Sequence, residues 1–221
     1  RIGDTPYGHW FDGCGMLSLF SIAEGKVHFK NRYVRTPKYL KETATQQIQY
    51  RGFGTQIPGG LKKNIGRMPG NPANTNSVYH AGKLLALYEG GRPFELDATT
   101  LETVGEYTYD GELKKSNVFS AHGHFHGPTG HWVNFGTGSM GIGRKGPKLC
   151  FNIFRIDETG KMAAKGQVPV DYFPFAHDFA LSSKYAIFFI NSINMGPVGK
   201  VMLGSASISE GVHFGKSLPM T

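Results

Sequence analysis

The histidines are the residues of this sequence most suited to chemistry. The chain has nine histidines in 221 residues. Three of them, His122, His124 and His126, alternate along a stretch with the character of a β-strand, where a period of two places all three on one face. Neutral imidazole is a good ligand for iron, copper, zinc or nickel. Neighbours on one face of a strand lie about 7 Å apart, which is further than three ligands of one ion comfortably allow. Histidines donated singly from different strands make a better metal site.

Glu89 is the carboxylate most suited to support such a site. It ends an apolar run and precedes two glycines, Gly90 and Gly91. A carboxylate at the end of a buried strand needs a partner. Two interpretations stay open: Glu89 accepts a hydrogen bond from the ring N–H of a metal-bound histidine, or it is a turn residue that bonds to the backbone.

Other patterns point to no catalytic group. Residues 138–143 are rich in glycine, but no helical pattern follows them, so they are predicted to form a loop rather than a phosphate site. Cys14 lies near Asp12 without an evident base, and no serine has the context of a nucleophile elbow. Cys14 and Cys150 match no disulfide or zinc pattern, which favours a reducing, cytoplasmic compartment.

The composition favours an all-β protein with one sizeable core. Hydrophobic residues make up 39% of the chain and charged residues 18%, with 31 glycines and 12 prolines. This balance is typical of many short strands joined by tight turns. The formal net charge is +8, but the basic residues are scattered, so the sequence does not favour a nucleic-acid partner.

Two patterns recur along the chain and indicate the architecture. Strand, polar turn and returning strand begin at Phe20, Phe94 and Phe154. Histidine, polar turn and apolar run begin at His80, His122 and His177. Repeats of about 40 to 55 residues are typical of the four-stranded blades of a β-propeller, and they fit a propeller better than a sandwich. If His122 and His177 lie on the inner strands of consecutive blades, both face the propeller axis.

An irregular insertion at about residues 36–76 interrupts this pattern. Thr36 can cap a helix and Pro37 suits a first helical turn, so a short helix is predicted to about Gln47. Residues 52–76 are rich in glycine, proline and lysine. A loop of this length is either functional or a surface excursion between two blades.

Four stretches of the sequence carry the motifs of a known family. They read HWFDGCGM from His9, NTN from Asn74 followed by HAGKLLALYEGG from His80, SAH ending at His122, and FAHDFA around His177. In this order they resemble the carotenoid cleavage oxygenase family, which includes stilbene-cleaving dioxygenases and the retinoid isomerohydrolase. The resemblance implies a seven-bladed β-propeller, of which this chain, a single domain over residues 1–221, forms roughly the first half.

The resemblance also implies a metal centre. The family holds Fe(II) on the propeller axis with four histidines, and glutamates support these ligands. Carried over to this chain, His122 and His177 are the first two ligands, and Glu89 accepts a hydrogen bond from the distal ring nitrogen of His177. The other two ligands are expected beyond Thr221, because His213 comes too early.

Two departures from the family pattern bear on the substrate class. Cys14 replaces a common acidic residue, and Gly123 and His124 replace a proline and a basic residue that often follow the first ligand. Neither position is a ligand.

The activity implied by the resemblance is oxidative cleavage by an iron dioxygenase. Dioxygen adds across one conjugated double bond of a carotenoid or apocarotenoid, giving two carbonyl products, and the present stretch alone is expected to be inactive. Two alternatives stay open: cleavage of a stilbene by the same chemistry, and a non-catalytic β-propeller that binds a partner. The iron content of the intact protein separates the last alternative from the others.

An insoluble polyene must reach the site from a membrane, and one apolar stretch could meet a bilayer. It is predicted to be a loop, either packed between blades or inserted into one leaflet near Lys184, Lys200 or the basic stretch at residues 62–67. Each basic residue near an anionic surface contributes about 1 kcal/mol. The apolar residues of this stretch are Ile193, Met195, Pro197, Val198, Val201, Met202 and Leu203.

Overall fold

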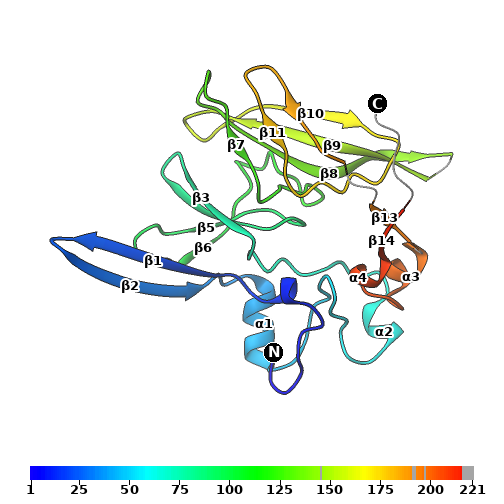
Figure 1. The fold of residues 1–221 in the computed structure, drawn as a ribbon. Helices are drawn as coiled ribbons and strands as arrows, with labels where there is room; N and C mark the ends of the chain where they lie inside the picture. Colours follow the sequence, from blue (N-terminus) through cyan, green and yellow to red (C-terminus); the bar gives the residue numbers. More distant parts are fainter. Residues whose placement is uncertain (145, 191–192, 197, 216–221) are drawn as a thin grey trace.

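The computed structural model describes residues 1–144, 146–190, 193–196 and 198–215, and two four-stranded antiparallel sheets form its centre (Figure 1). The first has the order β3-β4-β5-β6, formed by Asn76–His80, Lys83–Leu87, Phe94–Leu96 and Thr103–Glu106. The second has the order β10-β9-β8-β7, formed by Met162–Pro169, Gly146–Ile156, Trp132–Gly143 and His124–Phe125. Both are the four-stranded units that the repeats predict.

Strand β4 shows how the layers pack. Leu85 and Leu87 share one apolar cluster with Trp132 and Phe154 of the second sheet. Ala86 points to the opposite face and belongs to a different cluster with Val34 and Phe94. Because both faces of β4 are buried, its residues form a continuous apolar run instead of alternating with polar ones. The first sheet therefore lies between the second sheet and the segment that follows the N-terminal hairpin.

That hairpin consists of β1 (Met16–Ala23) and β2 (Lys26–Tyr33), and it projects from the rest of the chain in Figure 1. A short 3-10 helix, Trp10–Asp12, precedes it. Phe20 lies opposite Phe29, and Ile22 opposite Val27. These four side chains are exposed in this chain. Together with β5–β6 and β9–β10, the hairpin gives the three strand-turn-strand units that the first repeat predicts.

The prediction of a loop at residues 138–143 is wrong, because these residues belong to β8, which pairs with β9. The glycines of β8 have structural roles within the strand. A Cβ on Gly136 would lie 1.8 Å from the carbonyl oxygen of Val118, so the backbone of β8 passes too close for a side chain. The register shifts between Ser139 and Ile142, where Gly141 has a φ of 117°. Glycine thus marks a close approach and a bulge within a strand.

The helix predicted after Thr36 is confirmed as α1, Pro37–Thr45. The Thr36 hydroxyl accepts a hydrogen bond from the Tyr39 N–H at 3.2 Å, and the helix ends where Gln46 adopts a φ of 52°. Between α1 and β3, a short helix α2 (Leu61–Asn64) and a parallel bridge between Arg51 and Pro69 punctuate otherwise irregular chain.

The C-terminal segment contains more regular structure than the sequence indicates. Its elements are β11 (Ala180–Leu181), β12 (Ala186–Ile187), β13 (Ile193–Met195), α3 (Val198–Leu203), α4 (Ile208–Gly211) and β14 (Val212–Phe214). The loop predicted over the apolar stretch is therefore wrong, and Pro197 lies outside the described residues. The sequence around β13 shows no alternation of polar and apolar residues. Strand β13 forms by pairing with β14, which comes only after two helices. Within the described residues, no helix has the length and apolarity to cross a membrane.

Candidate metal site

Three side chains from distant parts of the chain meet at the ends of the two sheets. Glu89 follows β4, His122 precedes β7, and His177 precedes β11. The Glu89 Oε1 atom lies 3.3 Å from His122 Nε2 and 3.3 Å from His177 Nδ1. The two imidazole centroids are 4.2 Å apart. One potential ligand atom from each residue lies within 4.8 Å of the other two, so the structure brings together all three side chains that the sequence singled out.

Backbone and amide hydrogen bonds hold the segment before His122 in place. The Phe119 N–H donates to Gly91 at 3.1 Å, which ties this segment to the turn that carries Glu89. The Asn76 amide donates to the carbonyl of Ala121 at 2.9 Å, and the Ser120 N–H donates to Phe135 at 2.7 Å. Both sheets therefore hold the segment that precedes His122, and this brings His122 close to Glu89.

The polar atoms at the centre of this cluster lack hydrogen-bond partners. Glu89 Oε1 and His122 Nε2 are both buried, and despite their 3.3 Å separation neither makes a hydrogen bond. Leaving a buried polar atom unpaired costs roughly 1 to 3 kcal/mol, and a bound ion is one explanation for such atoms. Two imidazoles and one carboxylate are also a donor set that suits a transition metal. These residues fit a metal ion.

Electrostatics favour the form of His122 that a cation needs. Burial lowers the pKa of His122, and the neighbouring His177 lowers it further, so His122 is held neutral and able to donate its ring lone pair. Burial raises the pKa of Glu89 to about 7, with a further contribution from the charge of Asp178. A cation beside Glu89 would favour its ionised form.

The contact between Glu89 and His177 differs in detail from the prediction. The predicted hydrogen bond to the distal ring nitrogen is instead a 3.3 Å contact without hydrogen-bond geometry. The same carboxylate oxygen is equally close to His122, which the sequence did not indicate. The roles of His122 and His177 as ligands remain a prediction.

The other histidines do not enter the cluster, and the prediction of one strand face shared by His122, His124 and His126 is wrong. Strand β7 contains only His124 and Phe125. His124 Nε2 bonds to Asp178 at 2.8 Å, and His126 bonds to Thr129 at the turn that returns the chain to β8. A tight turn after two residues ends the alternation. His213 bonds to the carbonyl of Gly211.

Asp178 is a polar residue at the site that sequence reasoning missed. It directly follows His177. Burial opposes its ionisation, but the hydrogen bonds from His124 and from the Phe179 N–H prevail and lower the pKa of Asp178. The signal was present in the sequence as the acidic residue of the FAHDFA stretch, but its partner His124 was not identifiable without the fold.

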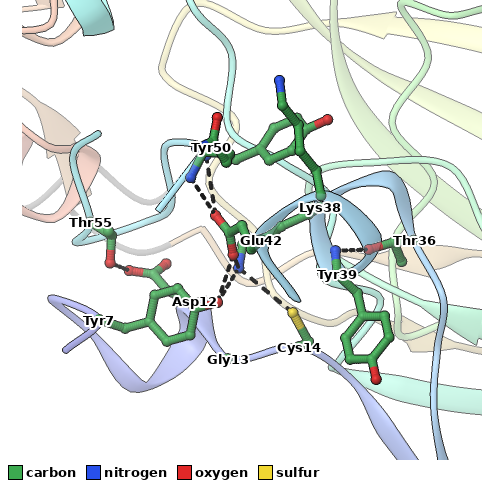
Figure 2. A network of polar contacts seen from close by, with 12 residues as sticks. Tyr7, Asp12, Gly13, Cys14, Thr36, Lys38, Tyr39, Glu42, Tyr50 and Thr55 are labelled. Atoms are coloured by element: carbon green, nitrogen blue, oxygen red, sulfur yellow. Dashed lines mark hydrogen bonds and ion pairs between the residues drawn. The ribbon is translucent and has the colours of Figure 1, made fainter. Parts of the chain in front are cut away.

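A second polar cluster lies away from these residues, near helix α1 (Figure 2). Lys38 Nζ donates to Glu42 at 2.8 Å and to Tyr7 Oη at 2.9 Å. Asp12 accepts hydrogen bonds from Thr55 at 2.6 Å and from the Gly54 N–H at 3.1 Å. Burial raises the pKa of the Cys14 thiol although Lys38 lies nearby. We call Tyr7, Lys38, Glu42 and Cys14 the helix network.

The fold defines a class of protein: consecutive four-stranded antiparallel sheets are the units of a β-propeller, and the cluster at their ends could hold a metal ion. The model of the RPE65 family, described as retinal pigment epithelial membrane protein, matches residues 1–221. The chain therefore belongs to this family, which includes carotenoid cleavage oxygenases, as the motifs predict.

Individual relatives agree with this assignment. The chain is 34% identical over 228 residues to apocarotenoid-15,15'-oxygenase from a Synechocystis strain, covering 99% of this chain and 45% of that protein. It is 34% identical to lignostilbene-alpha,beta-dioxygenase isozyme III of Sphingomonas paucimobilis, covering 82% of this chain and 36% of the relative. The crystal structure of cobalt-substituted Synechocystis ACO matches with a TM-score of 0.85 and 34% identity.

These matches also show how much of the complete fold this chain covers. The alignment with the cobalt-substituted structure covers 97% of this chain but 45% of the other. The chain thus spans less than half the length of its relatives. The prediction of a β-propeller, with this chain as part of it, is confirmed.

Proposed function

We propose that the protein containing this chain is a non-haem Fe(II) dioxygenase that cleaves a conjugated carbon–carbon double bond of a carotenoid or apocarotenoid into aldehyde or ketone products. The observation that carries the proposal is the cluster of Glu89, His122 and His177, whose buried oxygen and nitrogen atoms lack hydrogen-bond partners. Membership of a family of oxygenases supports it.

The residues of this chain hold and support the metal. His122 and His177 would supply two neutral ligands, and the other two are predicted beyond Thr221. When bound, Fe(II) supplies the redox centre that reaction with dioxygen requires. Glu89 would fix the ring orientation of the adjacent imidazole and offset part of the ionic charge. Ala121 and Phe119 belong to the same buried apolar cluster as Trp132, so the segment before His122 rests on a rigid, water-excluding support.

A stilbene is the second candidate substrate, because the lignostilbene dioxygenase is as similar in sequence, at 34% identity, as the apocarotenoid oxygenase. The broader coverage of this chain by the apocarotenoid oxygenase, 99% against 82%, favours the polyene. A non-catalytic binding propeller would leave the unpartnered atoms of the cluster without a purpose.

A direct test uses the full-length protein, purified with its native metal. We expect about one iron per molecule by elemental analysis and cleavage of an apocarotenal in air but not under nitrogen, with two carbonyl products by chromatography. Cleavage of resveratrol in place of the apocarotenal would establish the alternative. Protein without iron and without either activity would overturn the proposal.

We also propose that helix α3 contacts the membrane from which the polyene arrives. Val198, Met202 and Leu203 are exposed on this short helix, and Lys200 lies among them. Exposed apolar side chains beside a basic residue suit an interface with anionic lipid. The contact is through a helix and not through the loop that the sequence predicted.

A further inference from the structure

A hydrogen bond joins the two segments that carry His122 and His177. The His124 Nε2 atom lies 2.8 Å from Asp178 Oδ1. His124 is two residues beyond His122, and Asp178 directly follows His177. The pair thus connects the chain just after one candidate ligand to the chain just after the other.

Each end of this hydrogen bond is anchored in the fold. His124 belongs to β7 and lies opposite Val133 of β8. Asp178 Oδ1 also accepts a hydrogen bond from the Phe179 N–H at 2.7 Å, and the Phe179 ring is buried in the cluster with Val133 and Phe135. The His124 ring packs edge-on against the Phe179 ring, and the two ring centroids are 4.9 Å apart. The pair therefore fixes the segment that carries His177 relative to the second sheet.

The segment before His177 packs against the apolar cluster through Tyr172 and Ala176 but has few polar restraints. Residues 171–179 form neither helix nor strand. Among the residues that the structure describes, the bond between His124 and Asp178 is the one side-chain hydrogen bond that joins this segment to another part of the chain. Without it, the direction of the His177 side chain would depend on the apolar packing of Ala176 and Phe179 and on the contact with Glu89.

We propose that His124 and Asp178 are positioning residues that hold His177 beside His122 in the geometry a metal ion requires. The proposal rests on the metal centre of the proposed function. Holding a ligand in place before the metal arrives reduces the conformational freedom lost on binding. Substitution of residues that orient ligands costs roughly 10 to 100-fold in metal affinity.

A purely structural role predicts a different result. The side chains of His124 and Asp178 are 41% and 51% exposed, and pairs this exposed contribute little to global stability. Loss of the pair should therefore hardly change the unfolding of the metal-free protein. A large change in metal affinity with little change in stability identifies a positioning role.

The test measures Co²⁺ binding to the metal-free full-length protein by the visible absorption of the bound ion. We expect His124→Ala to weaken binding about tenfold and His124→Gln, whose amide can still donate to Asp178, to restore most of it. His124→Ala combined with Asp178→Ala should bind no more weakly than the worse single variant, since both remove the same interaction. Thermal unfolding of each metal-free variant checks the fold.

The matched control is His126→Ala. His126 lies two residues further along, bonds to Thr129 at 2.7 Å and to the carbonyl of Ser183 at 3.1 Å, and is not one of the three clustered residues. We expect it to bind Co²⁺ like the parent. Parental affinity in His124→Ala, or equal weakening in His126→Ala, would overturn the proposal. A parent protein that binds neither Co²⁺ nor iron would instead reject the metal centre itself.

Discussion

The helix network and the cluster at His122 both place a carboxylate next to basic or ring nitrogen atoms, but they satisfy it in opposite ways. Glu42 accepts hydrogen bonds from Lys38, from Tyr7 and from the N–H groups of Gln49 and Tyr50 (Figure 2). Glu89 Oε1 accepts none. A fully paired buried carboxylate stabilises a fold, whereas a carboxylate oxygen that is left unpaired beside two imidazoles is ready to support a cation.

The two clusters also differ in their access to solvent. The side chains of Lys38 and Glu42 are 2% and 0% exposed, so the helix network is closed. His177 is 66% exposed in this chain, which spans less than half the length of the relatives that it matches. Complete pairing and burial are what a structural contact requires.

Removing a ligand should have the largest effect. We expect His122→Ala and His177→Ala, each made in the full-length protein, to abolish iron binding and cleavage together, because each removes one of the imidazoles that would hold the metal. Elemental analysis and a turnover assay measure the two losses. His126→Ala should retain both properties. An iron-replete, active His122→Ala protein would contradict the comparison.

Breaking the helix network should affect stability and leave the metal in place. Lys38→Met leaves Glu42 buried without its counter-charge, and breaking a buried pair in this way costs about 3 to 5 kcal/mol. Denaturant unfolding of the metal-free protein measures this cost, and the iron content of the folded variant should equal that of the parent. Lys41→Met, an exposed position on the same helix, is the control and should change the free energy of unfolding by less than about 0.5 kcal/mol.

Glu89→Gln should lower iron occupancy or turnover roughly 10 to 100-fold, the usual effect of altering a residue that orients a ligand. The amide keeps the shape of the side chain but removes its charge. Glu95→Gln is the matched control, because Glu95 pairs with Lys83 on the neighbouring strand and lies outside the cluster. Full occupancy and full rate in Glu89→Gln would make Glu89 a structural residue like Glu42.

The smallest effect concerns the membrane. Replacing Met202 and Leu203 with glutamate should reduce flotation with anionic liposomes and cleavage of membrane-delivered substrate several-fold, because charged groups disfavour the apolar part of the interface. Val168→Glu, an exposed apolar position on β10, should leave binding unchanged. If the α3 variant binds lipid and cleaves as well as the parent, the substrate enters elsewhere.

The features that the sequence predicted correctly depend on residues that lie close together along the chain. Thr36 and Pro37 determine where α1 begins, and the recurring phenylalanine, turn and returning strand determine the hairpins, because caps and turns depend on residues close in sequence. The histidine and glutamate motifs identify Glu89, His122 and His177 by resemblance, although spacing alone leaves open which histidines meet.

Long-range contacts decided the rest. The glycines of β8 became part of a strand because β9 pairs along them, and Gly136 is needed where Val118 approaches the backbone closely. The pairing of His124 with Asp178, 54 residues apart, and the approach of one Glu89 oxygen to two imidazoles depend on how two sheets pack. A sequence specifies which groups can donate and accept, but only the packing of distant segments determines which of them find partners and which remain free to hold a metal ion.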